Sequence, residues 1–343
     1  MDRKREPAEP AEGIGVGKGP GPLFSASASE WRLRDHTFSL QRPAVMGILN
    51  LTPDSFSDGG ELPDLEGAVR KAEAMVDAGA RLLDVGGEST RPGAREVPEA
   101  EEIRRILPFV KEAVKRFSVP VSVDTRKSGV ARRVLAEGAH VINDVSGLSH
   151  DPLLGEVVAE AEAGLILMHM RGTPADMRSH ARYDDLMGEI LCELEAALGR
   201  ARAAGVSPER IALDPGIGFA KTAEHSVRVL RELGRVRTIG RPVVLGPSRK
   251  SFLGKVTGRP PRERVDGSVA ACVLGFLQGA RIFRVHDVRE VVDALRVAEA
   301  VEGEGIGGAV DRAGGAPGLE RLGGCAREKE AAKGPEGTRE AAG

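Results

Sequence analysis

The feature that most constrains this chain of 343 residues is a short apolar run that recurs eight times along its middle. Each run is too short for a helix and lacks polar alternation, which is typical of parallel strands buried on both faces. We therefore predict eight strands, at Val45–Leu49, Leu82–Val85, Val119–Val123, Val141–Ile142, Leu165–Met168, Ile211–Leu213, Val243–Leu245 and Ile282–Val285.

Helical patterns separate these runs. Apolar residues step by three and four positions along Leu65–Gly79, Leu186–Leu198, Val269–Leu277 and Val288–Leu295. Eight strand–helix units favour an α/β fold with a single closed (β/α)8 TIM barrel, and an open doubly wound sheet stays as the alternative. Ahead of the first strand, Trp31–Leu40 alternates about a probable turn, which predicts an N-terminal β-hairpin covering the bottom of the barrel.

The two ends of the chain differ from its middle. Residues 1–22 and 303–343 are rich in Gly, Ala, Glu and Pro and carry no sustained apolar period. Such segments bury too little apolar surface to offset the entropy of the chain. We predict two disordered tails and one folded domain at residues 23–302.

Composition excludes several classes of function. A net charge of −2 gives no basic excess for a nucleic-acid backbone, and no apolar run is long enough to span a membrane. Cys192, Cys272 and Cys325 have no metal or redox spacing, which favours a reduced, cytoplasmic protein without disulfides. Cys192 and Cys272 lie in helical patterns, so we expect both thiols in the core.

Polar groups stand where the apolar runs stop. In an α/β barrel these positions meet at the C-terminal mouth, where active sites are built. The groups concerned are Asn50, Gly86-Gly87-Glu88, Asp124, Asn143, His169, Asp214, Gly246 and His286.

Eight motifs at these strand ends give the chain a recognisable resemblance. They are MGILNLTPDSFSDGG (46–60), DVGGESTRPGA (84–94), SVDT (122–125), INDVSG (142–147), MHMRGTP (168–174), LDPGIGF (213–219), SRKS (248–251) and RVHDV (284–288). In this order they resemble the dihydropteroate synthase family along residues 31–300. The resemblance implies a transferase of folate synthesis that moves an alkyl group other than methyl. It would join p-aminobenzoate to 6-hydroxymethyl-7,8-dihydropterin pyrophosphate and expel pyrophosphate, with Mg2+ as cofactor.

A dihydropterin ring presents several N–H donors along one edge, so its pocket needs buried acceptors. Asp124, Asn143 and Asp214 would supply these acceptors from three strand ends, and Lys250 would donate to a ring acceptor. For a single Asp at a strand end, the alternative interpretation is a helix N-cap.

Pyrophosphate requires cations and N–H donors. Arg284 and His286 end the last strand just before a helix that begins near Asp287, so side chains and helix N-terminus can face one anion. The alternative for Arg284 is a salt bridge in the barrel wall. By resemblance, Asn50 contacts the metal and the diphosphate, and Arg91 belongs to a mobile loop.

Two loops, Leu51–Gly60 and Glu88–Glu96, are polar and exposed enough to act as lids. By resemblance they close once pyrophosphate and Mg2+ are present. Closure would complete the aminobenzoate pocket, to which the resemblance assigns Thr90, Pro92, Phe219, Ser248 and Lys250.

No pair of nucleophile and base is evident, and the chemistry does not require one. The electron-rich dihydropterin can delocalise positive charge, so we expect ionisation before amine attack and electrostatic catalysis. The residues assigned to catalysis are Arg91, Asp124, Asp214, Lys250, Arg284 and His286. His169 lies near the mouth and is equally consistent with a hydrogen-bonded wall residue.

Two rival functions stay open. One is a methyltetrahydrofolate-binding methyltransferase domain, which shares the fold but needs no diphosphate site. The other is a catalytically silent pterin-binding paralogue. The resemblance further implies a homodimer through Val265–Leu277 and Val288–Leu295, and sulfonamides as competitive inhibitors.

Overall fold

The computed structural model describes residues 29–34, 36–52, 64–303 and 320–321. Most of both predicted tails lies outside this part of the chain. Eight parallel strands form one sheet, each at or within a few residues of a predicted run. They are β3 (Ala44–Asn50), β4 (Leu82–Gly86), β5 (Val121–Asp124), β6 (Val141–Asp144), β7 (Gly164–Met168), β8 (Ile211–Asp214), β9 (Val244–Leu245) and β10 (Ile282–Val285).

The sheet closes on itself. Its strands follow the order β8-β7-β6-β5-β4-β3-β10-β9, and a parallel bridge between Leu213 and Val243 joins the two ends. Closure leaves the ladder without open edges, so the fold is a (β/α)8 barrel and the open-sheet alternative is excluded.

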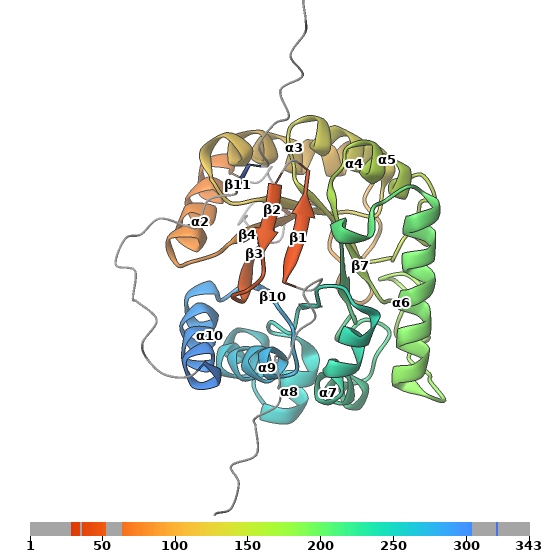
Figure 1. Cartoon of the computed structure of the whole chain (residues 1–343), viewed down its shortest axis with the longest axis vertical. Helices are drawn as coiled ribbons and strands as arrows, with labels where there is room; N and C mark the ends of the chain where they lie inside the picture. The colour runs from red at the N-terminus through yellow and green to blue at the C-terminus, as the bar shows by residue number, and fades with distance from the viewer. Residues whose placement is uncertain (1–28, 35, 53–63, 304–319, 322–343) are drawn as a thin grey trace, which may run out of the picture.

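Helices surround the barrel, as the ring of ribbons in Figure 1 shows. None of the described helices is long and apolar enough to cross a lipid bilayer. The α-helices are α2 (Leu65–Asp77), α3 (Glu99–Arg116), α4 (Ser128–Ala136), α5 (Leu154–Glu160), α6 (Leu186–Ala203), α7 (Ala223–Arg231), α8 (Ser251–Thr257), α9 (Val265–Leu277) and α10 (Val288–Glu302). Short 3-10 turns occur at Pro208–Arg210, Leu233–Ile239 and Pro261–Glu263.

Side chains alternate between the two faces of each strand. One set packs outward against the helices in a large apolar cluster, for example Leu83, Val123 and Leu213. The other set points into the barrel, where the first layer is apolar and includes Met46 and Ile282. Several of the next inward positions toward the C-terminal ends of the strands are polar, among them Asp84, Asn143 and Arg284, so polar groups gather at one mouth.

The predicted hairpin is present. Strands β1 (Glu30–Leu33) and β2 (His36–Ser39) pair antiparallel and lie across the end of the barrel that faces the viewer in Figure 1. Trp31 is fully buried there, packs in the inner apolar cluster, and donates its indole N–H to the Arg210 carbonyl at 2.8 Å. A further strand, β11 (Glu320–Arg321), pairs with β2, so two residues of the predicted C-terminal tail join this small sheet.

We predict that Trp31→Ala lowers the free energy of unfolding by about 3–5 kcal/mol, because it removes a large buried ring and leaves a cavity. Chemical denaturation measures the loss. Arg32→Ala is the matched control: its side chain is 42% exposed and pairs with Glu209, so its loss costs about 1 kcal/mol or less. Equal losses in both variants would contradict burial of the hairpin.

Candidate active site at the barrel mouth

Three polar side chains meet inside the barrel around Asp84, which no predicted site includes. Asp84 lies inside β4 and is fully buried. Its carboxylate accepts hydrogen bonds from Ser122 Oγ at 2.5 Å, Asn143 Nδ2 at 3.2 Å and Arg284 Nε at 2.6 Å. Asp84 therefore orients two predicted site residues, Asn143 and Arg284. Its sequence signal is a lone carboxylate within an otherwise apolar run.

Arg284 forms a second ion pair, because its Nη2 donates to Asp124 Oδ2 at 2.8 Å. Asp124 ends β5 and is buried. Burial raises the pKa of Asp124 to about 7, against the opposing effect of the Arg284 cation. Both interpretations of Arg284 from the sequence therefore apply. Arg284 makes salt bridges inside the barrel, and it also lies at the mouth.

Asp214 and Lys250 form the other side of the mouth. Asp214 ends β8, accepts the Gly216 backbone N–H at 2.7 Å, and has a pKa raised by burial. Burial lowers the pKa of Lys250 to about 8, although Asp214 opposes the shift. Lys250 Nζ donates to the Ile217 carbonyl and lies 4.5 Å from the centre of the Phe219 ring. The structure therefore brings three predicted site residues, Asp214, Phe219 and Lys250, together.

Glycines keep the space between these groups open. A Cβ on Gly86 would lie 3.6 Å from Asp124 Cβ and 4.0 Å from Asn50 Oδ1. A Cβ on Gly246 would lie 3.8 Å from Asp214 Oδ2. Without side chains at these two strand ends, a flat ligand can approach the carboxylates closely.

His286 lies at the mouth beside Ser248 and differs in charge from the sequence prediction. Ser248 Oγ and His286 Nδ1 are 3.0 Å apart, and the His286 backbone N–H donates to the same oxygen at 3.2 Å. Burial, together with the nearby Arg284 cation, lowers the pKa of His286 to about 3. The imidazole is neutral at pH 7, and the predicted cation is wrong for the protein without ligand.

The predicted loop residues stand apart from the buried cluster. Thr90 is partly exposed, whereas Arg91 and Pro92 are exposed. The backbone N–H of Gly93 donates to the Pro174 carbonyl at 2.8 Å, which ties this loop to the one after β7. In the other predicted lid, residues 53–60 lie outside the described part of the chain.

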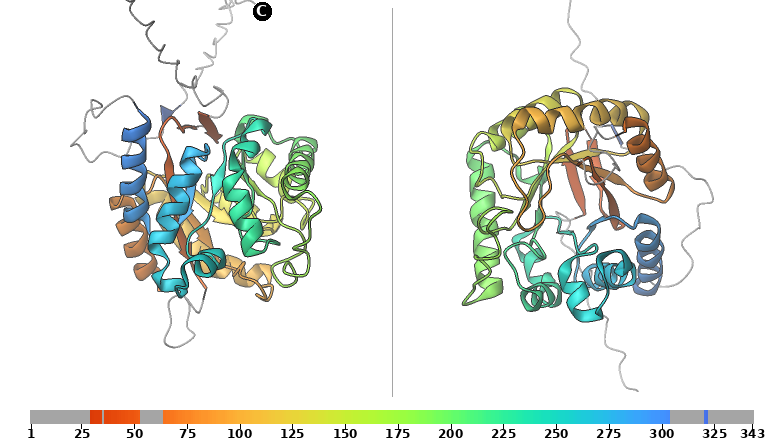
Figure 2. Two further views of the ribbon diagram at one scale, coloured as in Figure 1. Left: turned by 90° about the horizontal axis from the view of Figure 1, so that it is seen from below. Right: turned by 180° about the vertical axis from the view of Figure 1, so that it is seen from behind.

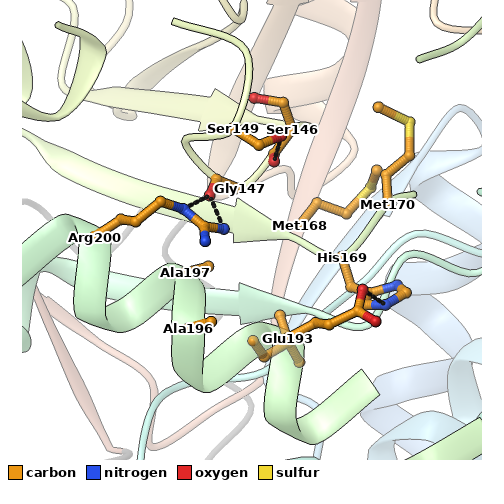
Figure 3. Close-up of a pocket in the computed structure, with 11 residues that line it drawn as sticks. Ser146, Gly147, Ser149, Met168, His169, Met170, Glu193, Ala196, Ala197 and Arg200 are labelled. Carbon is orange, nitrogen blue, oxygen red and sulfur yellow. Dashed lines mark hydrogen bonds and ion pairs between the residues drawn. The ribbon is translucent and has the colours of Figure 1, made fainter. Parts of the chain in front are cut away.

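His169 is a hydrogen-bonded wall residue. Its ring is buried between Lys221 Nζ, 2.7 Å from Nδ1, and Glu193 Oε2, 3.0 Å from Nε2. Burial lowers its pKa to about 4, so the ring stays neutral. The ring lines a cavity of about 190 Å³ between the ends of β6 and β7 and helix α6. Figure 3 shows His169 and Glu193 beside one another there. None of the residues predicted to bind substrate lines this cavity.

The prediction for Cys192 is wrong, because its thiol is exposed, whereas Cys272 is buried as expected. Cys192 lies two residues after the buried Ile190 on α6, about 200° around the helix from the core face. Cys325 lies outside the described residues.

Comparison with known proteins identifies the class. Residues 46–286 match the family model described as "Pterin binding enzyme". A dihydropteroate synthase of Synechocystis sp. is 47% identical over 262 residues, which cover 76% of this chain and 91% of that protein.

Two solved structures are similar as well. A Yersinia pestis dihydropteroate synthase with a sulfonamide drug complex has a TM-score of 0.76 at 45% identity and covers 80% of this chain and 99% of its own. A Xanthomonas albilineans dihydropteroate synthase with 4-aminobenzoic acid has a TM-score of 0.76 at 43% identity, with coverage of 81% and 99%.

The fold, the mouth and the matched model thus define a barrel enzyme of the pterin-binding class. Within that class, the chain belongs to the dihydropteroate synthase family.

We predict that Asp84→Asn lowers the free energy of unfolding by about 2–3 kcal/mol, because one carboxylate oxygen becomes an amide NH2 that faces a hydrogen-bond donor, while Arg284 keeps Asp124 as its counterion. Urea denaturation measures this change. Ser122→Ala, which removes a single donor to the same carboxylate, should cost only about 1 kcal/mol. A smaller loss for Asp84→Asn than for Ser122→Ala would refute the central position of Asp84.

Proposed function

We propose that this chain condenses 6-hydroxymethyl-7,8-dihydropterin pyrophosphate with p-aminobenzoate to give 7,8-dihydropteroate and pyrophosphate in folate synthesis. The observation that carries the proposal is the pair of buried carboxylates, Asp124 and Asp214, which share the electrostatic influence of Arg284 at one mouth. This arrangement suits a ligand that joins a ring rich in N–H donors to a diphosphate.

The pterin ring would enter the space that Gly86 and Gly246 leave open. Asp124, Asn143 and Asp214 would accept its N–H groups, and Lys250 would donate to a ring acceptor. Asp84 already holds the Asn143 amide by its nitrogen, so the amide oxygen is the atom left for the ligand.

The diphosphate would lie toward Arg284, His286 and the N-terminus of α10. A neutral His286 can donate one N–H and take up a proton as the anion approaches, because a nearby negative charge raises the pKa of an imidazole. Arg284 would keep its ion pair with Asp84, and other N–H groups of its guanidinium would donate to the phosphate oxygens.

Mg2+ fits this site as an ion carried mainly by the diphosphate. Among the described residues, no cluster of three His, Cys, Asp or Glu side chains could hold a metal. Asn50 would offer one amide oxygen beside Gly86, and Mg2+ commonly combines few protein ligands with substrate phosphates. When bound, Mg2+ would neutralise part of the charge on the departing pyrophosphate.

Catalysis would rest on electrostatics and position. Asp124 and Asp214 would stabilise positive charge on the dihydropterin as the C–O bond to pyrophosphate breaks, while Arg284, His286 and Arg91 stabilise the leaving anion. The aminobenzoate nitrogen would then bond to the pterin methylene carbon and lose a proton. No protein nucleophile is required for this sequence.

The aminobenzoate would bind between the loop with Thr90, Arg91 and Pro92 and the surface formed by Phe219, Ser248 and Lys250. The relatives solved with a sulfonamide and with 4-aminobenzoic acid support a site for such aryl amines in this family. We expect sulfonamides to compete with aminobenzoate here.

We further propose a cytoplasmic homodimer. Leu274 and Leu277 on α9 and Val297 and Val301 on α10 are exposed apolar side chains on adjacent helices, which supports an interface there. The thiols of Cys192 and Cys272 are unpaired in the described structure, which supports a reducing compartment.

A single assay tests the function. Purified protein with both substrates and Mg2+ should release pyrophosphate and form dihydropteroate, and a chelator should abolish turnover. If ionisation precedes attack, slow pyrophosphate release should continue when aminobenzoate is omitted. A silent paralogue would bind the pterin without release, and a methyltransferase relative would instead bind methyltetrahydrofolate.

Binding of the pterin should depend on pH through Asp124. Its pKa in the free protein is about 7, and only the carboxylate accepts pterin N–H groups, so bound pterin favours loss of the proton. Below pH 7 affinity should rise about tenfold per pH unit, and it should level off above pH 7. Calorimetry in buffers of different ionisation enthalpy would detect the released proton. Constant affinity from about pH 5.5 to 8 would contradict this assignment.

A further inference from the structure

A buried group of four charged side chains lies beside the mouth and takes no part in the proposed chemistry. Glu88 follows β4, Arg126 and Lys127 follow β5, and Glu102 belongs to α3. Arg126 Nη2 binds Glu88 Oε1 at 2.5 Å, and Lys127 Nζ bridges Glu88 and Glu102, with 2.6 Å to Glu102. The side chains are 1–11% exposed. We call this set the Glu88 cluster.

The Glu88 cluster has two acids and two bases, and burial raises the pKa of Glu102 against the opposing effect of Lys127. Burial alone would lower the pKa of Lys127, but Glu102 and Glu88 raise it above its ordinary value. Burial would likewise raise the pKa of Glu88, and its hydrogen bonds to Lys127 and Arg126 hold it below its ordinary value. Both groups therefore stay ionised, and removing one partner would leave an uncompensated buried charge.

The Glu88 carboxylate joins the two ends of the loop that carries Arg91. It begins the loop in sequence, and its Oε2 accepts the backbone N–H of Val97 at 3.2 Å. The loop is thereby closed at its base by a side chain that the barrel itself holds through Arg126 and Lys127.

A second contact holds the far end of the same loop. His150, from the segment after β6, lies with Nδ1 3.5 Å from Arg126 Nη1 and with Nε2 3.3 Å from Glu96 Oε1. A neutral ring protonated on Nε2 would accept from Arg126 and donate to Glu96. Arg126 is thus connected to both ends of the loop, through Glu88 and through His150.

The same two segments also carry two carboxylates of the barrel interior. Asp84, which orients Arg284, lies four residues before Glu88, and Asp124 lies three residues before Lys127. If ligand binding displaces either segment, the base of the loop would move as well, because only a few residues separate the two. Between its ends the loop exposes Arg91 and Pro92.

We propose that Glu88, held by Arg126 and Lys127, is the positioning residue that sets where the Arg91 loop stands over the aminobenzoate. This inference rests on the proposed function of the mouth and deepens it. The Glu88 cluster acts on the second substrate through the loop, and it leaves pterin binding to the barrel interior.

The test compares Glu88→Gln with Arg91→Ala. Gln keeps the shape of Glu88 and an oxygen for the Val97 N–H, but it removes the charge that holds Arg126 and Lys127. Both variants should lower kcat/KM for aminobenzoate by up to about a hundredfold, since small misplacements of a positioning group have effects of this size. Pterin pyrophosphate affinity, measured by calorimetry without aminobenzoate, should change less than about threefold, a shift of under 1 kcal/mol.

Arg132→Ala is the matched control. It removes an exposed ion pair between α4 and Glu160, on the helix that follows Lys127 directly. Its kinetic constants and thermal stability should equal those of the unaltered protein.

Hydrogen exchange gives a readout that is independent of catalysis. Amides of residues 89–97 should exchange faster in Glu88→Gln than in the unaltered protein and the control, while peptides from β4 and β5 keep their protection. If the single variant unfolds, Glu88→Gln combined with Arg126→Met removes one acid and one base and keeps the Lys127–Glu102 ion pair, so no charge of the cluster is left without a partner. The same measurements apply to this double variant.

The outcomes separate the two proposals. Unchanged exchange in residues 89–97, or equal losses in aminobenzoate kinetics and pterin affinity, would overturn the role of Glu88. If the unaltered protein makes no dihydropteroate, the proposed function fails, yet the exchange experiment still decides whether Glu88 holds the loop.

Discussion

Closure of the parallel ladder is the constraint on which the rest of this structure depends. Once β8 and β9 meet, every strand delivers its C-terminal residue to the same mouth, and alternation along the strands decides which side chains face inward. Asp84, Asp124 and Asp214 share that inward face although they are far apart in sequence. The hairpin with Trp31 covers the opposite end, so the barrel has an apolar base and a polar mouth. The right view in Figure 2 shows the barrel from the side opposite to the one seen in Figure 1, where the hairpin faces the viewer.

Such a polar interior depends on ion pairs that offset the cost of burying its charges. Asp84 and Asp124 lie in an environment where a lone carboxylate would be strongly disfavoured, and Arg284 offsets both. The same arrangement leaves Asp124 with a pKa near 7 and His286 with a pKa near 3. Asp124 and His286 are therefore less charged before the substrate binds than their residue types suggest. N–H donors of a ligand would favour the charged form of Asp124, and a diphosphate would favour the charged form of His286.

The sequence predicted the positions of the strands, the hairpin and the residues at the strand ends, because burial on both faces leaves a clear apolar pattern. It missed Asp84, since one carboxylate inside the run Leu82–Val85 does not interrupt that pattern. The charge of His286 also depends on burial and on Arg284, which no local pattern encodes. Cys192 is exposed although α6 has an apolar spacing, because only the side of the helix with Ile190 and Leu194 faces the core.

The Glu88 cluster extends the same logic from the interior to the loops. A loop that must move cannot be fixed by a large apolar contact, because closing and opening would then require burying and exposing that surface each time. Charged groups at its base can instead fix the direction in which the loop extends, while the tip of the loop stays exposed. Since Glu88 and Lys127 follow the strands that carry Asp84 and Asp124, the order in which the two substrates bind would be built into the connection between barrel and loop. Binding of the first ligand would fix the positions of β4 and β5. The loop would then place Arg91 beside the second ligand.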